Sequence, residues 1–225
     1  MRKELPGCAR CSFQTSERLC QKEDGNAPPF CPTKNYDEII NKALDVLKDP
    51  DVLEFARQAS IQEAEGYANR HLDYQNVKPV KPRIQETIEF AHRMKYKRLG
   101  LAFCLGLVKE AKVIEKLLTA EGFEVVSTLC KVGREPKETI GVQDDQKIRI
   151  GCFESMCNPI AQAFVINSEN TEFNIVVGLC VGHDSLFLKY AEAPCTVLAA
   201  KDRLLGHNPL AAIYTIDSYY RSLKH

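Results

Sequence analysis

The chain has 225 residues, and its 30 basic and 30 acidic side chains give a formal charge of zero. Proteins that bind nucleic acid or a membrane surface through a broad electrostatic field need an excess of basic residues, so neither class is expected. Hydrophobic residues make up 44% and charged residues 27%, values that are ordinary for a folded globular protein and that argue against disorder. The unusual feature is the ten cysteines, which are too few for a small disulfide scaffold and indicate another role.

The cellular compartment decides how these cysteines are interpreted. The amino terminus has no apolar segment of the signal-peptide type, and no stretch approaches the roughly 18 to 20 apolar residues of a membrane span. We therefore expect a cytoplasmic protein that does not enter a membrane. In a reducing cytoplasm, thiols stay free, bind metal or carry out redox chemistry, and stable disulfides are uncommon.

Four cysteines lie in the first 31 residues, with the spacing C-x2-C-x8-C-x10-C. They are Cys8, Cys11, Cys20 and Cys31. The segment is rich in Gly, Pro and polar residues and has too few apolar side chains for a core, so we expect a loop-rich knot over residues 1–34 that folds around a metal. Four thiolates suit a closed zinc site or an iron-sulfur cluster. Zinc ribbons usually have two close pairs of cysteines, whereas Cys20 and Cys31 are not paired, which argues against a zinc ribbon. We favour an iron-sulfur cluster, and zinc is the alternative.

The remaining pattern predicts an α/β protein. Residues 35–78 carry apolar side chains at helical spacing and are expected to form a pair of helices. Residues 79–225 alternate short apolar runs with helical segments, which predicts a small parallel sheet of about four strands, Rossmann-like or flavodoxin-like, with helices on both faces. The runs lie at 99–103, 124–129, 174–179 and 196–200. If the strand order is 2-1-3-4, it reverses between the first and the third strand.

Cysteines follow the first three of these runs. They are Cys104, Cys130 and Cys180. The carboxyl ends of parallel strands share one edge of the sheet, and ligands bind there beside the point where strand order reverses. A fourth thiol, Cys157, precedes a predicted helix start at Asn158-Pro159, where the helix N-terminus favours the thiolate. The sequence therefore predicts a second site, a crevice with these four thiols as metal ligands or redox groups.

Other polar residues are expected at the same edge. They are Lys131, His183, Lys201, Asp202 and His207. The two imidazoles are candidates for proton transfer, and the two lysines for holding a small anionic substrate or offsetting thiolate charge. Buried packing of each cysteine as a small hydrophobe is the alternative. It is preferred for Cys195, which begins a strand at the opposite edge, and Cys152 is given no firm role.

At these residues the chain resembles a family of uncharacterised, metal-binding proteins, mainly from anaerobic bacteria and archaea, that is known only as a domain of unknown function. Several matching segments lie in the α/β region: 100–107, 130–133, 156–161, 178–184, 201–203 and 206–209. A further match, Cys8-Ala9-Arg10-Cys11, opens the N-terminal four-cysteine motif. The resemblance covers nearly the whole chain. It implies metal binding and no established reaction.

Two functional hypotheses follow, and a third stays open. The preferred one is a metal-binding protein of iron-sulfur type with a four-cysteine site near the N-terminus and a second thiol-lined site in the crevice. The alternative is a thiol redox or sulfur-transfer enzyme with structural zinc in the knot and Cys157 as nucleophile. A redox partner protein fits either. The third is a non-catalytic module that binds a partner protein through residues 1–75. Phosphate-binding glycine motifs are missing, so no nucleotide cofactor is expected.

Overall fold

The structure is a computed structural model that describes residues 4–73 and 75–224. The chain divides into two compact units, Met1–Ile61 and Gln62–His225. The division falls inside the helix α3 (Pro50–Glu65). The domain boundaries expected at residues 34 and 78 remain predictions. No helix in the described residues has both the length and the apolar composition needed to cross a membrane.

The first unit is held together without a hydrophobic core. It contains the short 3-10 turns η1 (Cys8–Arg10) and η2 (Thr15–Glu17), followed by the helices α1 (Pro32–Asn35), α2 (Asp37–Val46) and the larger part of α3. Among the described residues 4–61, none is buried. Apolar side chains on α2 stand in solvent; Ile39 is 56% exposed and Leu44 53%.

Local sequence explains where these helices begin. Pro32 occupies the first turn of α1, where its missing N–H costs nothing. The helical region therefore begins before residue 35, where the sequence predicts its start. The helical conformation is interrupted at Tyr36, and α2 begins at the next residue. At α3 the carboxylate of Asp49 accepts hydrogen bonds from the backbone N–H groups of Asp51, at 2.9 Å, and Val52, at 3.2 Å. Asp49 therefore caps the helix that Pro50 opens.

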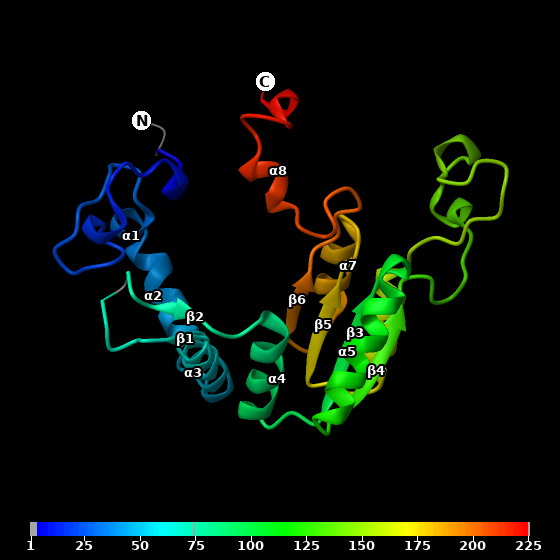
Figure 1. Cartoon of the computed structure of the whole chain (residues 1–225), viewed down its shortest axis with the longest axis horizontal. Coiled ribbons are helices and arrows are strands. Elements are labelled where there is room, and N and C mark those ends of the chain that lie inside the picture. Colours follow the sequence, from blue (N-terminus) through cyan, green and yellow to red (C-terminus); the bar gives the residue numbers. More distant parts are fainter. Residues whose placement is uncertain (1–3, 74, 225) are drawn as a thin grey trace. The chain divides into compact units, whose positions relative to one another are not determined.

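The second unit contains a four-stranded parallel sheet in the order β4-β3-β5-β6, which confirms the predicted fold class (Figure 1). The strands are β3 (Arg98–Phe103), β4 (Glu124–Leu129), β5 (Phe173–Val177) and β6 (Cys195–Ala199). Every residue of β5 is buried, because this central strand is covered on both faces. Strand order reverses between β3 and β5.

Helices cover this sheet. α4 (Arg83–Arg93) precedes it, α5 (Val108–Ala120) joins β3 to β4, α6 (Pro159–Ser168) joins β4 to β5, and α7 (His183–Tyr190) joins β5 to β6. In Figure 1, α5 lies in front of the strands and α7 behind them, and α6 packs against α7. Leu118, Ile166 and Phe187 are fully buried between these helices and the sheet.

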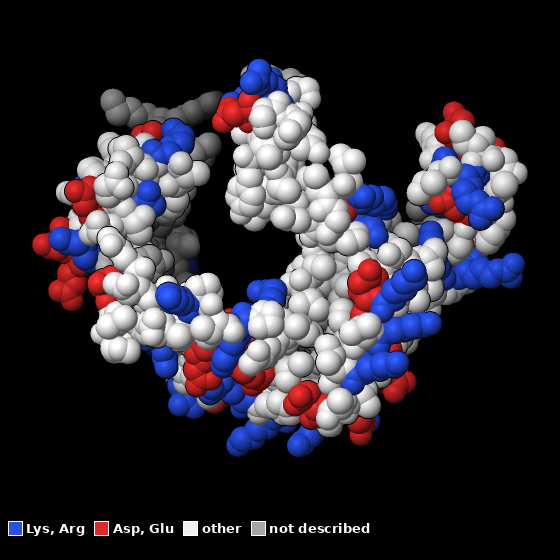
Figure 2. Space-filling view, in the orientation of Figure 1, with Lys and Arg blue, Asp and Glu red and all other residues white. Residues whose placement is uncertain are grey.

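Smaller elements complete the second unit. β1 (Tyr67–Ala68) and β2 (Lys78–Pro79) form a short antiparallel pair, η3 (Leu105–Leu107) leads into α5, and α8 (Leu210–Tyr214) and η6 (Arg221–Leu223) follow β6. In the space-filling view, acidic and basic side chains are interspersed on the visible face (Figure 2).

A long excursion, residues 131–158, separates β4 from α6. It contains the turns η4 (Lys137–Ile140) and η5 (Asp144–Gln146), and its two arms meet at an antiparallel bridge between Pro136 and Ser155. The ammonium group of Lys147, whose side chain is 4% exposed, forms ion pairs with Glu138 and Asp144 inside it. This excursion is therefore an ordered loop with its own internal polar contacts.

Candidate functional site: a thiol crevice and a cysteine-lined cavity

The predicted strand-end cysteines surround one cavity of about 440 Å³ at the carboxyl edge of the sheet. Phe103 is in register with Leu129 on β4 and with Val177 on β5. The residues that follow these three strands therefore emerge side by side. We call this cavity the thiol crevice; it is lined by Cys104, Leu105, Gly106, Cys130, Lys131, Ile148, Arg149, Phe153, Glu154, Ser155, Cys157, Cys180, Lys201 and Arg203.

Cys157 reaches the crevice because α6 begins directly after it. The side-chain oxygen of Asn158 accepts a hydrogen bond from the Ala161 N–H at 3.0 Å, and Pro159 occupies the first helical turn. This arrangement is the N-cap that the sequence predicts. The Asn158 N–H donates to the carbonyl oxygen of Cys130 at 2.8 Å. The cap thereby fixes Cys157 beside the end of β4, with 3.8 Å between its Sγ and that of Cys130.

A fully buried glutamine also holds α6 against the strand ends. The side-chain amide of Gln162 donates to the carbonyl oxygens of Thr128, at 2.8 Å, and Phe103, at 3.3 Å. These carbonyls belong to β4 and β3, the two strands that Cys130 and Cys104 directly follow. Sequence reasoning missed this residue, since a glutamine within an apolar helical stretch gives no sign that it is buried.

Cys130 is the central thiol of the crevice. It is 2% exposed, and the Leu105 N–H donates to its Sγ at 3.3 Å. Its thiol forms side-chain hydrogen bonds with both Cys104 and Cys157, and these raise the pKa of Cys130 far above its ordinary value. Cys130 therefore keeps its proton at neutral pH and shares it with the two flanking sulfurs.

The two flanking thiols are shifted in the opposite direction. The hydrogen bond from Cys130 is the largest cause in both cases, and it lowers the pKa of Cys104 to about 5 and that of Cys157 to about 4. Lys201 adds to the effect at Cys104, while His183 and Lys131 add to it at Cys157. At neutral pH the crevice thus holds two thiolates on either side of one protonated thiol.

The predicted histidine and lysines take defined positions around these sulfurs. His183, at the start of α7, hydrogen-bonds Cys157, which raises the pKa of the imidazole. Its Nδ1 atom is buried, and no described residue is its hydrogen-bond partner. The ammonium of Lys131 donates to the Ser155 carbonyl oxygen at 2.5 Å. Lys201 lies over Gly106, where a Cβ added to the glycine would come within 2.8 Å of the lysine Nζ.

Cys180 occupies a separate part of the crevice with Arg203. A guanidinium nitrogen of Arg203 donates to the Cys180 Sγ at 2.9 Å. Burial nevertheless raises the pKa of the Cys180 thiol, because loss of hydration outweighs the nearby positive charge. Arg203 belongs to a segment that carries the family resemblance, but the sequence analysis did not choose it as a site residue. Its position directly after Lys201-Asp202, two predicted site residues, could have identified it from the sequence.

The structure does not bring every predicted residue into the crevice. The Asp202 N–H donates to Nδ1 of His207 at 3.2 Å, and the Asp202 carboxylate accepts from the N–H groups of Leu204 and Leu205. Both side chains therefore close the turn after β6, and neither lines the thiol crevice. Cys152 is exposed in the excursion, and Cys195 donates to the Ala193 carbonyl oxygen at the far end of the sheet.

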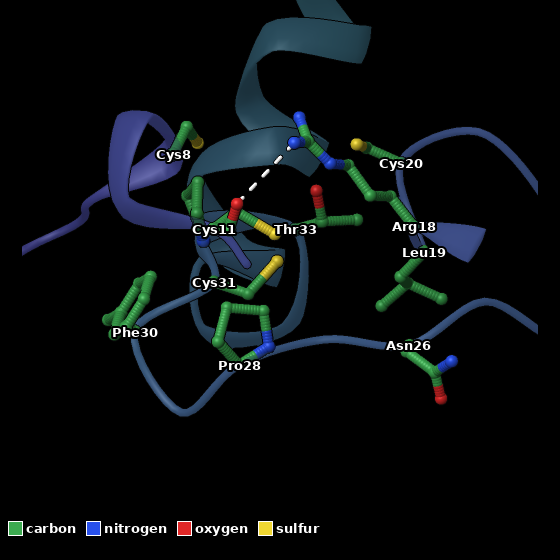
Figure 3. Close-up of a pocket in the computed structure, with 11 residues that line it drawn as sticks. Cys8, Cys11, Arg18, Leu19, Cys20, Asn26, Pro28, Phe30, Cys31 and Thr33 are labelled. Atoms are coloured by element: carbon green, nitrogen blue, oxygen red, sulfur yellow. Dashed lines mark hydrogen bonds between the residues drawn. The ribbon is translucent and has the colours of Figure 1, made fainter. Parts of the chain in front are cut away.

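The four N-terminal cysteines line another cavity, of about 50 Å³, inside the first unit (Figure 3). In Figure 3 the sulfur atoms of Cys11, Cys20 and Cys31 point into it. Arg18 crosses the cavity and donates to the Cys11 carbonyl oxygen at 3.4 Å. A set of four thiols is chemically suited to a closed metal site. Throughout residues 4–73 and 75–224, however, no three His, Cys, Asp or Glu side chains are placed so that together they hold a metal ion.

Two comparisons relate this chain to known proteins. A family model described as a protein of unknown function (DUF1847) matches residues 31–198. An uncharacterised protein of Methanocaldococcus jannaschii is 42% identical over 183 residues, which cover 81% of this chain and 86% of the relative. The resemblance to an uncharacterised family is thereby confirmed. The match to the family model contains all four crevice cysteines but only Cys31 of the N-terminal four.

Proposed function

Because the chain belongs to the DUF1847 family of proteins of unknown function, we propose its function from the geometry of the thiol crevice: a thiol redox enzyme that exchanges disulfides, with Cys157 as nucleophile and Cys130 as resolving thiol. The observation that carries this proposal is the distance of 3.8 Å between the two sulfurs, combined with the contact of His183 to Cys157. A thiolate next to a second thiol is the arrangement that disulfide exchange requires.

The proposed reaction balances as an exchange of sulfur–sulfur bonds. The Cys157 thiolate attacks one sulfur of a substrate disulfide, forming a mixed disulfide and releasing the first substrate thiolate. Cys130 then attacks the Cys157 sulfur, passing its proton to the neighbouring Cys104 thiolate, and releases the second substrate thiolate. The substrate is reduced by two electrons and the protein is oxidised to the disulfide. A thiol reductant, either a small thiol or a dithiol protein, must reverse the oxidation.

The charges around the crevice favour a small anionic disulfide as the substrate. Lys131, Lys201, Arg149 and Arg203 line the cavity, and within the described residues none of these four has a carboxylate within ion-pair distance. The one acidic side chain in the lining, Glu154, is paired with Lys137 at 2.7 Å. The cations outnumber the two thiolates, so the crevice retains positive charge for a ligand.

This proposal is tested by reducing 2-hydroxyethyl disulfide with the full-length protein and dithiothreitol as the final reductant. We expect turnover that falls by at least about 100-fold in Cys157→Ser, since the nucleophile is lost. Cys195→Ser is the matched control, because Cys195 is half-buried at the opposite edge of the same sheet. Equal turnover by wild type and Cys157→Ser would reject the proposal. Metal analysis of both proteins tests the alternative that the crevice thiols are ligands.

We further propose that Cys8, Cys11, Cys20 and Cys31 bind a metal ion or cluster. The support is the absence of any buried residue among the described positions 4–61, together with the single cavity that all four thiols line. A segment without a core needs another source of folding free energy, and a metal bound by four thiolates supplies it. Zinc and an iron-sulfur cluster both suit this donor set.

Anaerobic purification followed by metal analysis and an absorption spectrum decides between the two metals. Bound iron and sulfide with broad absorbance near about 400 nm indicate a cluster, and a colourless protein with bound zinc indicates a structural zinc site. In either case we expect Cys31→Ser to lose the metal. Cys152→Ser, which changes an exposed cysteine of the excursion, is expected to keep it. Full metal occupancy in Cys31→Ser would contradict the assignment.

A further inference from the structure

The thiol crevice contains a third sulfur for which the exchange reaction proposed above has no bond-forming role. Cys104 follows β3 and Cys130 follows β4, at the positions directly after the register pair Phe103 and Leu129. The hydrogen-bond ladder continues to both residues, since the Cys130 N–H donates to the Phe103 carbonyl oxygen at 2.9 Å and the Cys104 N–H donates to the Val177 carbonyl oxygen at 3.1 Å. The two cysteines are therefore neighbours on adjacent strands.

This placement meets the geometric requirement for a disulfide. Neighbouring strands lie about 4.8 Å apart, and disulfide-linked residues have Cα atoms about 4.4 to 6.8 Å apart. The side chains also meet, because the Cys104 and Cys130 thiols are hydrogen-bonded to each other. The Leu105 N–H, which belongs to the residue after Cys104, donates to the Cys130 Sγ at 3.3 Å. The Cys130 sulfur therefore has two neighbouring thiols with which it can form a disulfide, Cys104 and Cys157.

We propose that Cys104 is a second resolving thiol, which moves the disulfide from the Cys130–Cys157 pair to the Cys104–Cys130 pair and returns Cys157 to its reactive form. In this step the Cys104 thiolate attacks the Cys130 sulfur. The Cys104–Cys130 bond forms, the Cys130–Cys157 bond breaks, and Cys157 leaves as a thiolate. The number of disulfides is unchanged, so no oxidant or reductant is needed. The proton that Cys104 received from Cys130 passes to solvent. The inference rests on the proposed exchange function.

Two features of the crevice favour movement in this direction. A thiol that is stable as a thiolate is the better leaving group, and His183 and Lys131 stabilise the thiolate of Cys157. Cys104 is only 7% exposed, whereas Cys157 is half-buried at the start of α6. The exchange therefore transfers the disulfide to the more buried pair and leaves the more accessible thiolate free for another substrate molecule.

A time course on the full-length, metal-loaded protein tests this step. The reduced protein is mixed anaerobically with excess 2-hydroxyethyl disulfide, quenched with acid, alkylated and mapped by peptide mass spectrometry. We expect the Cys130–Cys157 disulfide first, followed by its loss as the Cys104–Cys130 disulfide forms. Late samples should contain molecules that carry both the Cys104–Cys130 disulfide and a mixed disulfide on Cys157. Cys152 and Cys195 serve as internal reference thiols.

The variants separate failure of the further inference from failure of the proposed function. In Cys104→Ser we expect the Cys130–Cys157 disulfide to form more slowly, because Cys104 no longer accepts the Cys130 proton, and then to persist, while the late mixed disulfide on Cys157 is lost. If wild type stops at the Cys130–Cys157 disulfide with Cys104 alkylated throughout, the second resolving role is wrong while the exchange function stands. If wild type forms neither disulfide and Cys157 stays unmodified, both are wrong. Because wild type is the deciding sample, the test holds even where a variant fails to fold.

Discussion

The reactivity of Cys157 depends on a few contacts that one substitution can remove. The hydrogen bonds from Cys130 and His183 are the two largest causes that lower the pKa of Cys157, to about 4. A thiolate reacts with an alkylating agent and a thiol does not, so reactivity is lost as pH falls through the pKa. We predict that iodoacetamide alkylation of Cys157 is half-maximal near pH 4 and constant above about pH 6. Rates from peptide mass spectrometry between pH 3 and 8 check this.

The substitution His183→Gln should move this profile to higher pH. Glutamine fills similar space but carries no positive charge, so one of the interactions that favour the thiolate disappears. We expect the midpoint to rise by about one pH unit, with the plateau rate at high pH nearly unchanged. His92→Gln is the matched control, because His92 lies on α4 and contacts Glu121 and Phe123 away from the crevice. An unshifted midpoint in His183→Gln would exclude the proposed role of the imidazole.

At the scale of elements, the excursion forms one wall of the crevice, and its order depends on a buried ammonium group. Lys147 pairs with Glu138 and Asp144 and donates to the Cys152 carbonyl oxygen at 3.2 Å. We predict that Lys147→Met, which keeps the apolar stem and removes the charge, gives several-fold faster hydrogen exchange of backbone amides in residues 137–154. Exchange within the sheet should not change, because the contact is internal to the excursion.

Lys48→Met is the control for this substitution. Lys48 forms a comparable pair with Asp45 at 2.7 Å, but its side chain is 78% exposed, and exposed pairs contribute little to stability. We expect no change in exchange around residue 48. Equal protection of residues 137–154 in Lys147→Met and wild type would show that other contacts hold the excursion in place.

The strands and the cysteines at their carboxyl ends could be predicted from the sequence, but the loop contacts beside them could not. The alternation of apolar runs and helical segments predicts the four strands, and the rule that parallel strands end at one edge predicts that Cys104, Cys130 and Cys180 gather there. The roles predicted for His207 and Asp202 stay predictions; their side chains bond within the turn after β6, and neither lines the thiol crevice. Such loop contacts depend on three-dimensional closure, which residue spacing does not determine.

At the scale of the whole molecule, the two units differ in what stabilises them. The second unit has a buried apolar core around β3 and β5, whereas the described residues 4–61 contain no buried side chain. Binding of a structural metal supplies about 10 to 16 kcal/mol to small zinc-binding peptides, which is enough to fold a segment that has no core. The stability of the first unit should therefore depend on metal, and that of the second should not.

We accordingly predict that a strong chelator unfolds one unit only. In limited proteolysis, chelator treatment should make sites within residues 4–61 cleavable at least about tenfold faster, while residues 62–225 persist as a resistant fragment. Cys31→Ser should show the fast cleavage without chelator, and Cys152→Ser should behave as wild type. Restoring zinc or iron to the chelated protein should restore protection. Protection of residues 4–61 that survives complete removal of metal would mean that the N-terminal thiols are not what folds this unit.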